Sequence, residues 1–220
     1  MKELILKLTE IESIKIVSDS DVDFAKVDYC CGELVAYFVY NNNEFIIGQA
    51  SAGDLCENFI ARLQKNLKNE LQIHESIKQN LGFMYNQYCH QLPLLSSEFV
   101  KILSKSGESS YWVGLDYDVW STYISTKSML TTWLYNDDKG NIIFEVTPLY
   151  QWSFLPDEPE DPDFQTYEEF MKDYKPLITR VIPRQVAIEW LGQVMKVYRG
   201  LFSTEENYKN MCKELGWEDC

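Results

Sequence analysis

The chain has 220 residues and carries 34 acidic against 20 basic side chains, a formal net charge of −14. Hydrophobic residues make up 45% and aromatic residues 14% of the chain, enough for a packed core, which excludes an intrinsically disordered protein. A surface this negative disfavours nucleic acid and anionic lipid as partners and favours a basic protein.

The first half begins with segments typical of β-strands. Strands are expected near 12–17 and 24–31, followed by a hairpin whose arms are 33–40 and 44–50. Three asparagines at 41–43 separate the two arms, and asparagine tolerates the positive φ angles that tight turns need. The sequence therefore predicts an antiparallel sheet at the N-terminal end of the chain.

Helical periodicity replaces this pattern from Ser51 onward. Ser51 and Asp54 resemble a capping box at the start of the first helix, which the apolar spacing extends to about residue 67. A second helix is expected over 73–88 and a third over 96–105.

The second half repeats the same order of elements. Residues 111–123 alternate like a strand, and a hairpin is expected between 129–135 and 141–154 around the turn at 136–140. Helices are expected from Thr166, from Pro183 and from Ser203, the last ending at Gly216.

These elements predict an α+β fold with antiparallel sheet and segregated helices, in the order strands, helices, strands, helices. Two organisations fit this order. The chain is either one domain over 1–220 or two β-then-α halves, 1–108 and 109–220.

The compartment is predicted from the cysteines and the N-terminus. The first sixteen residues contain several acids and lack an uninterrupted apolar stretch, so we expect mature protein here and not a secretory signal peptide. No apolar run is long enough to span a bilayer. We therefore expect a cytoplasmic protein, with no membrane association and with all six cysteines reduced.

No motif indicates a catalytic, cofactor or metal site. Asp19, Asp21 and Asp23 imitate the start of a calcium loop, but Phe24 and Cys30 stand where that loop needs glycine and glutamate. Glycine-rich phosphate loops are absent, and the two histidines have no metal-binding spacing. We expect no cofactor and no metal, and an enzyme is the less favoured class.

One constellation of acidic and aromatic residues is a candidate site. If 111–123 is a strand, alternation places Asp116 and Asp118 on the same face as Trp112 and Trp120. Glu145 joins them if the strand around 141–149 is a neighbour. Such a face suits ion pairs and cation–π contacts with lysine and arginine.

An acidic loop is the second candidate. It begins after Pro156 and includes two further prolines, which keep it extended and stiff. Its acids are Asp157, Glu158, Glu160, Asp161 and Asp163.

These features predict an acidic protein-binding protein whose partner is a basic protein, with an undetermined oligomeric state. Bacterial-type immunity proteins and antitoxins, which inhibit basic toxins or nucleases, have this combination of properties, an analogy of class only. Two alternatives stay open. One is a small hydrolase that uses the carboxylates on the tryptophan-flanked sheet face, and the other is a structural or regulatory subunit.

Overall fold

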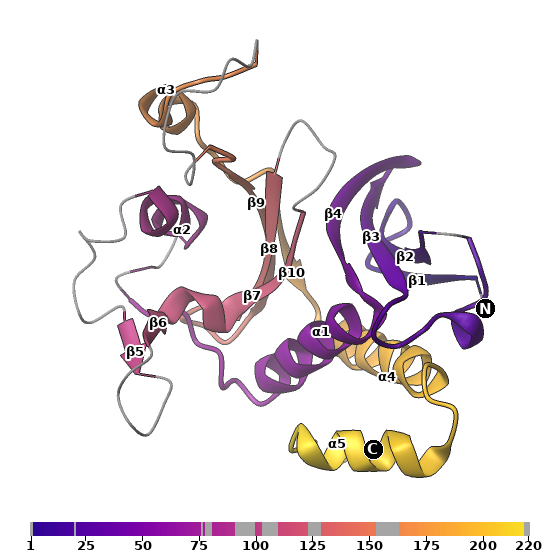
Figure 1. Ribbon diagram of the computed structural model, residues 1–220. Helices are drawn as coiled ribbons and strands as arrows, with labels where there is room; N and C mark the ends of the chain where they lie inside the picture. Colours follow the sequence, from indigo (N-terminus) through magenta and orange to yellow (C-terminus); the bar gives the residue numbers. More distant parts are fainter. Residues whose placement is uncertain are drawn as a thin grey trace.

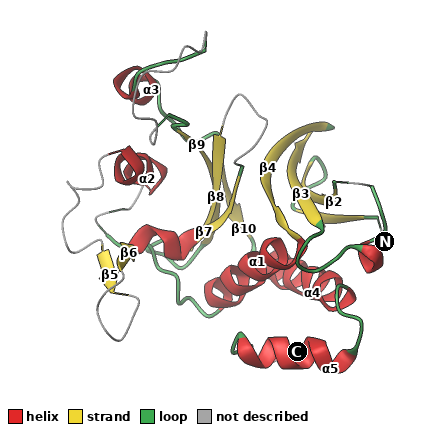
Figure 2. Cartoon of the chain, viewed as in Figure 1, coloured by secondary structure: helices red, strands yellow, loops and turns green. Residues whose placement is uncertain are grey.

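The computed structural model describes residues 2–19, 21–75, 77, 81–90, 100–102, 110–122, 129–152 and 163–217. Within them the chain forms two four-stranded antiparallel sheets, a two-stranded sheet and five α-helices (Figures 1 and 2). The predicted α+β class with antiparallel sheets is confirmed.

The N-terminal sheet is a meander of four strands in sequence order. Its strands are β1 (Glu3–Lys7), β2 (Glu12–Ser18), β3 (Glu33–Tyr40) and β4 (Asn43–Ser51). The strict exposed–buried alternation of β1 shows that one face of this sheet is covered and the other faces solvent.

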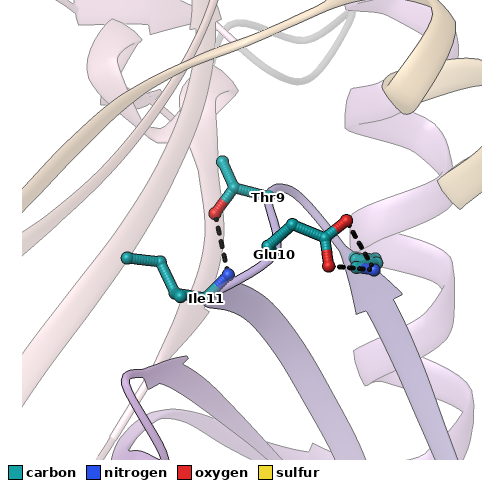
Figure 3. A network of polar contacts seen from close by, with 4 residues as sticks. Thr9, Glu10 and Ile11 are labelled. Carbon is teal, nitrogen blue, oxygen red and sulfur yellow. Dashed lines mark hydrogen bonds and ion pairs between the residues drawn. The ribbon is translucent and has the colours of Figure 1, made fainter.

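Local turn chemistry joins these strands. Between β1 and β2, the Lys7 ammonium donates to the Glu10 carboxylate at 3.1 Å and the Ile11 N–H donates to Thr9 Oγ1 at 3.3 Å (Figure 3). Between β3 and β4, Asn41 and Asn42 take positive φ angles, as the hairpin prediction requires.

The second large sheet has the strand order β10–β9–β8–β7. Its strands are β7 (Asp118–Ser121), β8 (Met129–Asn136), β9 (Ile142–Leu149) and β10 (Ile178–Ile182). The β8–β9 hairpin confirms the second hairpin prediction, and Gly140 provides the positive φ of its turn.

Five α-helices complete the described part of the fold. They are α1 (Ala52–Leu67), α2 (Leu81–His90), α3 (Tyr167–Lys172), α4 (Arg184–Gly200) and α5 (Glu205–Glu214). Ser51 caps α1, and Thr166 with Glu169 forms the predicted capping box of α3. Helix α5 is capped by Thr204, one residue later than the predicted Ser203.

Several predicted elements differ in the structure. Residues 24–31 form no strand; a short 3₁₀-helix, η1 (Phe24–Lys26), begins there because the Asp23 side chain accepts from the Ala25 N–H. The helix expected over 96–105 is wrong where the structure describes it, because Val100–Ile102 is a strand, β5. The predicted start of the second helix at Ile73 is also wrong, because the Ile73 N–H donates to the Asn136 carbonyl of β8.

The main core lies between the two sheets and the helices α1 and α4. These two helices pack on each other, and α1 also contacts strands of both sheets (Figure 1). Buried side chains from both sheets belong to one continuous cluster. Strand β4 approaches β7 closely because Gly48 has no side chain; a Cβ there would lie 2.5 Å from the Trp120 Cβ.

A second cluster covers the opposite face of the β7–β10 sheet. Helix α2 contributes Leu81, Tyr85 and Cys89 to it, and β8 contributes Trp133 and Tyr135. This sheet is therefore buried on both faces, unlike the N-terminal sheet. No helix in the described part of the chain is long and apolar enough to cross a membrane.

Candidate functional site

A groove lies between the loop after η1 and the C-terminal helix α5. It has a volume of about 710 Å³. Its walls combine carboxylates, side-chain amides and the rings of Tyr29 and Phe202. A concave site that joins apolar rings to a few charged groups is what recognition of a side chain or small ligand requires.

The loop wall is held by its own carboxylate. Asp28 Oδ1 accepts from the N–H groups of Cys31 at 2.7 Å and Cys30 at 2.9 Å. These backbone hydrogen bonds hold the pKa of the exposed Asp28 carboxyl below its usual value. Asp28 therefore stays ionised at neutral pH and presents a negative charge at the groove.

The same loop is docked on the N-terminus of α1. The Ala52 N–H donates to the Gly32 carbonyl at 2.7 Å and the Gly53 N–H donates to the Tyr29 carbonyl at 3.0 Å. A Cβ on Gly53 would lie 2.7 Å from the Tyr29 ring. Glycine at position 53 thus lets the Tyr29 ring lie against the first turn of the helix.

The Tyr29 hydroxyl takes part in a hydrogen-bonded cluster of three residues, which we call the tyrosine clamp: Tyr29, Glu57 of α1 and Tyr198 of α4. Both phenols donate to the same carboxylate oxygen, Glu57 Oε1, and the Tyr198 contact measures 2.6 Å. Burial first, and then the hydrogen bond to Glu57, raises the pKa of Tyr29 to about 12 and that of Tyr198 above its usual range. Both phenols are therefore protonated donors at neutral pH.

The clamp fixes an aromatic layer beneath the groove. The Tyr29 ring lies 5.1 Å from Phe202 and 6.2 Å from Tyr198, measured between ring centroids. Glu57 itself lines a second cavity of about 330 Å³, together with Lys65, Lys68 and Trp217. The clamp thus joins the walls of two cavities.

The opposite wall of the groove comes from the segment that leaves α4 and from α5. It presents Phe202, Met211, Asn207, Asn210 and Glu214. The Thr204 hydroxyl accepts from the Asn207 N–H and so fixes the start of α5.

The lining of the groove holds two acids and one base: Asp28 and Lys26 on the loop side and Glu214 on α5. The surrounding segment is more acidic, because residues 19–33 contain five acids and Lys26 as their one base, a net charge of −4. Asp19, Asp21 and Asp28 of this segment are exposed. The net negative charge of this region favours the approach of a cation.

Trp112 and Trp120, which the sequence places on one face beside Asp116 and Asp118, are both buried. Residues 110–121 do not form one strand: β6 (Ser110–Trp112) and β7 are separated by a 3₁₀-helix, η4 (Val113–Tyr117). This interruption breaks the alternation, so Trp112 belongs to the cluster under α2 and Trp120 to the main core. The Trp120 indole N–H donates to the Leu55 carbonyl at 3.0 Å.

The carboxylates of that predicted face do not share an exposed surface. Glu145 of β9 is buried. Burial raises the pKa of its carboxyl, whereas hydrogen bonds with Tyr135 and Thr179 lower that pKa in part. Burial raises the pKa of Asp118 to about 6, although the Arg62 charge lowers it. Asp116 is half-buried in η4.

Four acids of the predicted acidic loop, Asp157, Glu158, Glu160 and Asp161, lie outside the described residues. Asp163 begins the next described segment and is exposed. Their role in partner binding stays a prediction.

The cysteines differ from the sequence prediction at one position. Cys30, Cys31, Cys56 and Cys89 are free, whereas Cys212 of α5 is disulfide-bonded. The expectation of six reduced thiols is therefore wrong for Cys212. Across the described ranges, no group of three or more histidine, cysteine or acidic side chains is arranged to hold a metal ion.

The tyrosine clamp has no signal in the sequence. Glu57 is separated from Tyr29 by 28 residues and from Tyr198 by 141 residues. Only the packing of α1 against α4 and the loop brings the three together.

No protein-family model, curated protein or solved structure matches this chain.

Proposed function

We propose that this protein is an acidic binding protein that captures a basic protein partner through the groove between the loop at 25–30 and α5. The observation that supports it is the ionised Asp28 beside the Tyr29 and Phe202 rings in a 710 Å³ groove. Lysine and arginine combine a cationic head with an apolar stem. In the groove, the Asp28 carboxylate complements the cationic head and the aromatic rings complement the stem.

In this proposal a lysine or arginine of the partner enters the groove. Its charged head pairs with Asp28 and Glu214, while its stem covers Phe202 and Met211. The amides of Asn207 and Asn210 supply further hydrogen-bond acceptors for a guanidinium. Because the tyrosine clamp already holds the Tyr29 ring in place, little side-chain freedom is lost on binding.

The net charge of −14 adds long-range attraction to the local contacts. It speeds the encounter with a cationic partner and makes capture sensitive to salt. An inhibitor of a basic toxin or nuclease, of the immunity or antitoxin type, is the form of this function we put first. A nucleic-acid-binding surface is cationic, so the acidic wall complements it.

The test is a comparison of charge-neutralised variants in affinity capture. Tagged wild-type protein and the double variant Asp28→Asn/Glu214→Gln are incubated with a lysate of the native source at low salt, and bound proteins are quantified by mass spectrometry. The Asp28→Asn substitution keeps a side-chain oxygen for the Cys30 and Cys31 N–H groups, so the loop retains its hydrogen bonds.

The matched control removes two negative charges elsewhere. Glu3→Gln/Asp173→Asn changes two exposed acids outside the groove. We expect a stoichiometric basic protein that wild type and control both retain and that the groove variant loses. Equal retention by all three proteins, or capture of no basic protein by the wild type, overturns the proposal.

A further inference from the structure

A third concave site opens between the two sheets, away from the groove at α5. It has a volume of about 270 Å³ and is almost entirely apolar. Strands β3, β4, β8, β9 and β10 line it with Phe38, Tyr40, Phe45, Ile47, Leu130, Val146, Ile178 and Arg180, together with Leu177 just before β10. We call it the inter-sheet pocket.

The charge that lines this pocket is already neutralised. The Arg180 guanidinium donates from Nε to Glu12 Oε1 at 2.7 Å, and it lies over the Phe38 ring at 5.9 Å. Its Nη1 donates to the Thr179 carbonyl at 2.9 Å. With this cation paired, the pocket favours an uncharged apolar group.

The size and rim of the pocket favour a protein side chain over a small ligand. Ligand clefts have volumes of about 300–1,000 Å³, and this pocket is smaller. Around its mouth Tyr40, Phe45 and Leu177 are 41%, 52% and 54% exposed. A small molecule inside the pocket leaves these rings and chains in water, whereas a macromolecule covers them.

The pocket adjoins an unprotected sheet edge. Strand β10 is the last strand of its sheet, and among the described elements only β9 packs extensively against it. It contains no lysine or proline, its charged residue Arg180 is paired with Glu12, and Val181 is 58% exposed. The edge strand β1 differs, because Glu3 and Lys7 occupy two of its three exposed positions and discourage added strands.

We propose that an extended segment of a basic protein partner adds to the sheet along β10 and places an apolar side chain in the inter-sheet pocket. Main-chain hydrogen bonds to an exposed edge supply affinity in this mode, and a pocket for alternate side chains supplies specificity. The sign of the partner's charge rests on the proposed function; the pocket and the edge do not.

A second copy of this chain is the less suitable occupant. Two copies each carrying −14 repel one another. An antiparallel β10–β10 pair centred on Arg180 also places two guanidinium groups opposite each other, which destabilises a sheet.

The test uses a phage-displayed library of random peptides selected at low salt on the wild-type protein. Selected peptides are synthesised with a fluorophore. Their Kd is measured by anisotropy against wild type, Val181→Lys, Leu177→Lys and the groove variant Asp28→Asn/Glu214→Gln. Both side chains are more than half exposed, so the variants are expected to fold. Circular dichroism and thermal unfolding check this directly. The matched control, Ile5→Lys, alters an exposed residue on the β1 edge.

We expect the selected peptides to have apolar residues at alternate positions. Their affinity is expected to fall at least tenfold for Val181→Lys and Leu177→Lys and to equal the wild-type value for Ile5→Lys. Bound peptide is also expected to slow hydrogen exchange of the β10 amides. Peptides that depend only on Asp28 and Glu214 refute the β10 site while leaving the proposed function standing. Peptides that depend on β10 but not on Asp28 do the reverse. Selection of no peptide, or a wild-type dimer that Val181→Lys dissociates in sedimentation, overturns the inference.

Discussion

Replacing Glu57 with alanine removes the acceptor of both phenols in the tyrosine clamp. Tyr198 is fully buried, so its hydroxyl loses a hydrogen bond to a charged group and finds no water in exchange. Leaving such a buried donor unsatisfied costs about 1–3 kcal/mol. Tyr29 is half-buried and regains water, so it adds up to about 1 kcal/mol. We expect Glu57→Ala to lower the free energy of unfolding by about 1–4 kcal/mol.

A double-mutant cycle separates the clamp from other effects of the substitution. Tyr198→Phe alone removes one charged hydrogen bond and costs about 1–2 kcal/mol. In the Glu57→Ala background, however, the same change removes a hydroxyl that has no partner, and it costs little. The expected coupling energy between the two positions is therefore at least about 1 kcal/mol.

Urea unfolding followed by tryptophan fluorescence gives the four free energies of the cycle. Glu189→Ala, which changes an exposed glutamate on α4, is the control and is expected to stay within about 0.5 kcal/mol of wild type. A coupling energy below about 0.3 kcal/mol means that the two substitutions are additive. That result contradicts the clamp.

Three further predictions follow from buried or closely packed groups. Gly48→Ala forces a Cβ against Trp120 and is expected to cost about 1–3 kcal/mol in urea unfolding, whereas Gly192→Ala, with no atom within 4 Å of its Cβ and a helical position, is neutral or stabilising; equal costs at the two sites contradict the close approach of β4 and β7. The raised pKa of Asp118, about 6 against an ordinary 3.8, favours the folded state fully below pH 3.8 and loses this effect as the pH rises through 6. Between pH 4 and 8 the wild type is thus expected to lose up to about 3 kcal/mol of stability relative to Asp118→Asn, and parallel pH profiles refute it. The pKa of Tyr29 is raised to about 12, so the protonated phenol stabilises the folded state fully below pH 10, and this stabilisation is lost as the pH rises through 12. Absorbance at 295 nm is therefore expected to show one phenol that ionises at higher pH than an ordinary tyrosine, and Tyr29→Phe is expected to remove this signal.

Local chemistry explains the parts of the fold that the sequence predicted. The Asn41–Asn42 turn, the Ser51 cap and the Thr166–Glu169 capping box each depend on residues within four positions of one another. Such signals act before any tertiary contact forms, and the elements they begin or join are found where expected.

The tryptophan-flanked face was wrong for a reason that periodicity cannot detect. Alternation indicates which side chains share a face, but not whether that face meets water. The β7–β10 sheet is covered on both sides, so Glu145 alternates with core residues and is nevertheless buried. The 3₁₀-helix at 113–117 has no local marker either, since its residues alternate as well as those of a strand.

Both proposed surfaces depend on groups that tertiary structure has already fixed. The Asp28 carboxylate is oriented by two backbone N–H groups, and the Tyr29 ring is held by Glu57 and by the α1 N-terminus. At the other surface, the pairing of Arg180 with Glu12 keeps an apolar pocket free of net charge. Ordering side chains costs free energy on binding, and groups ordered by folding avoid that cost. In the proposed function, the net negative charge speeds the approach of a basic partner, and we propose that the fixed groups determine which basic partner remains bound.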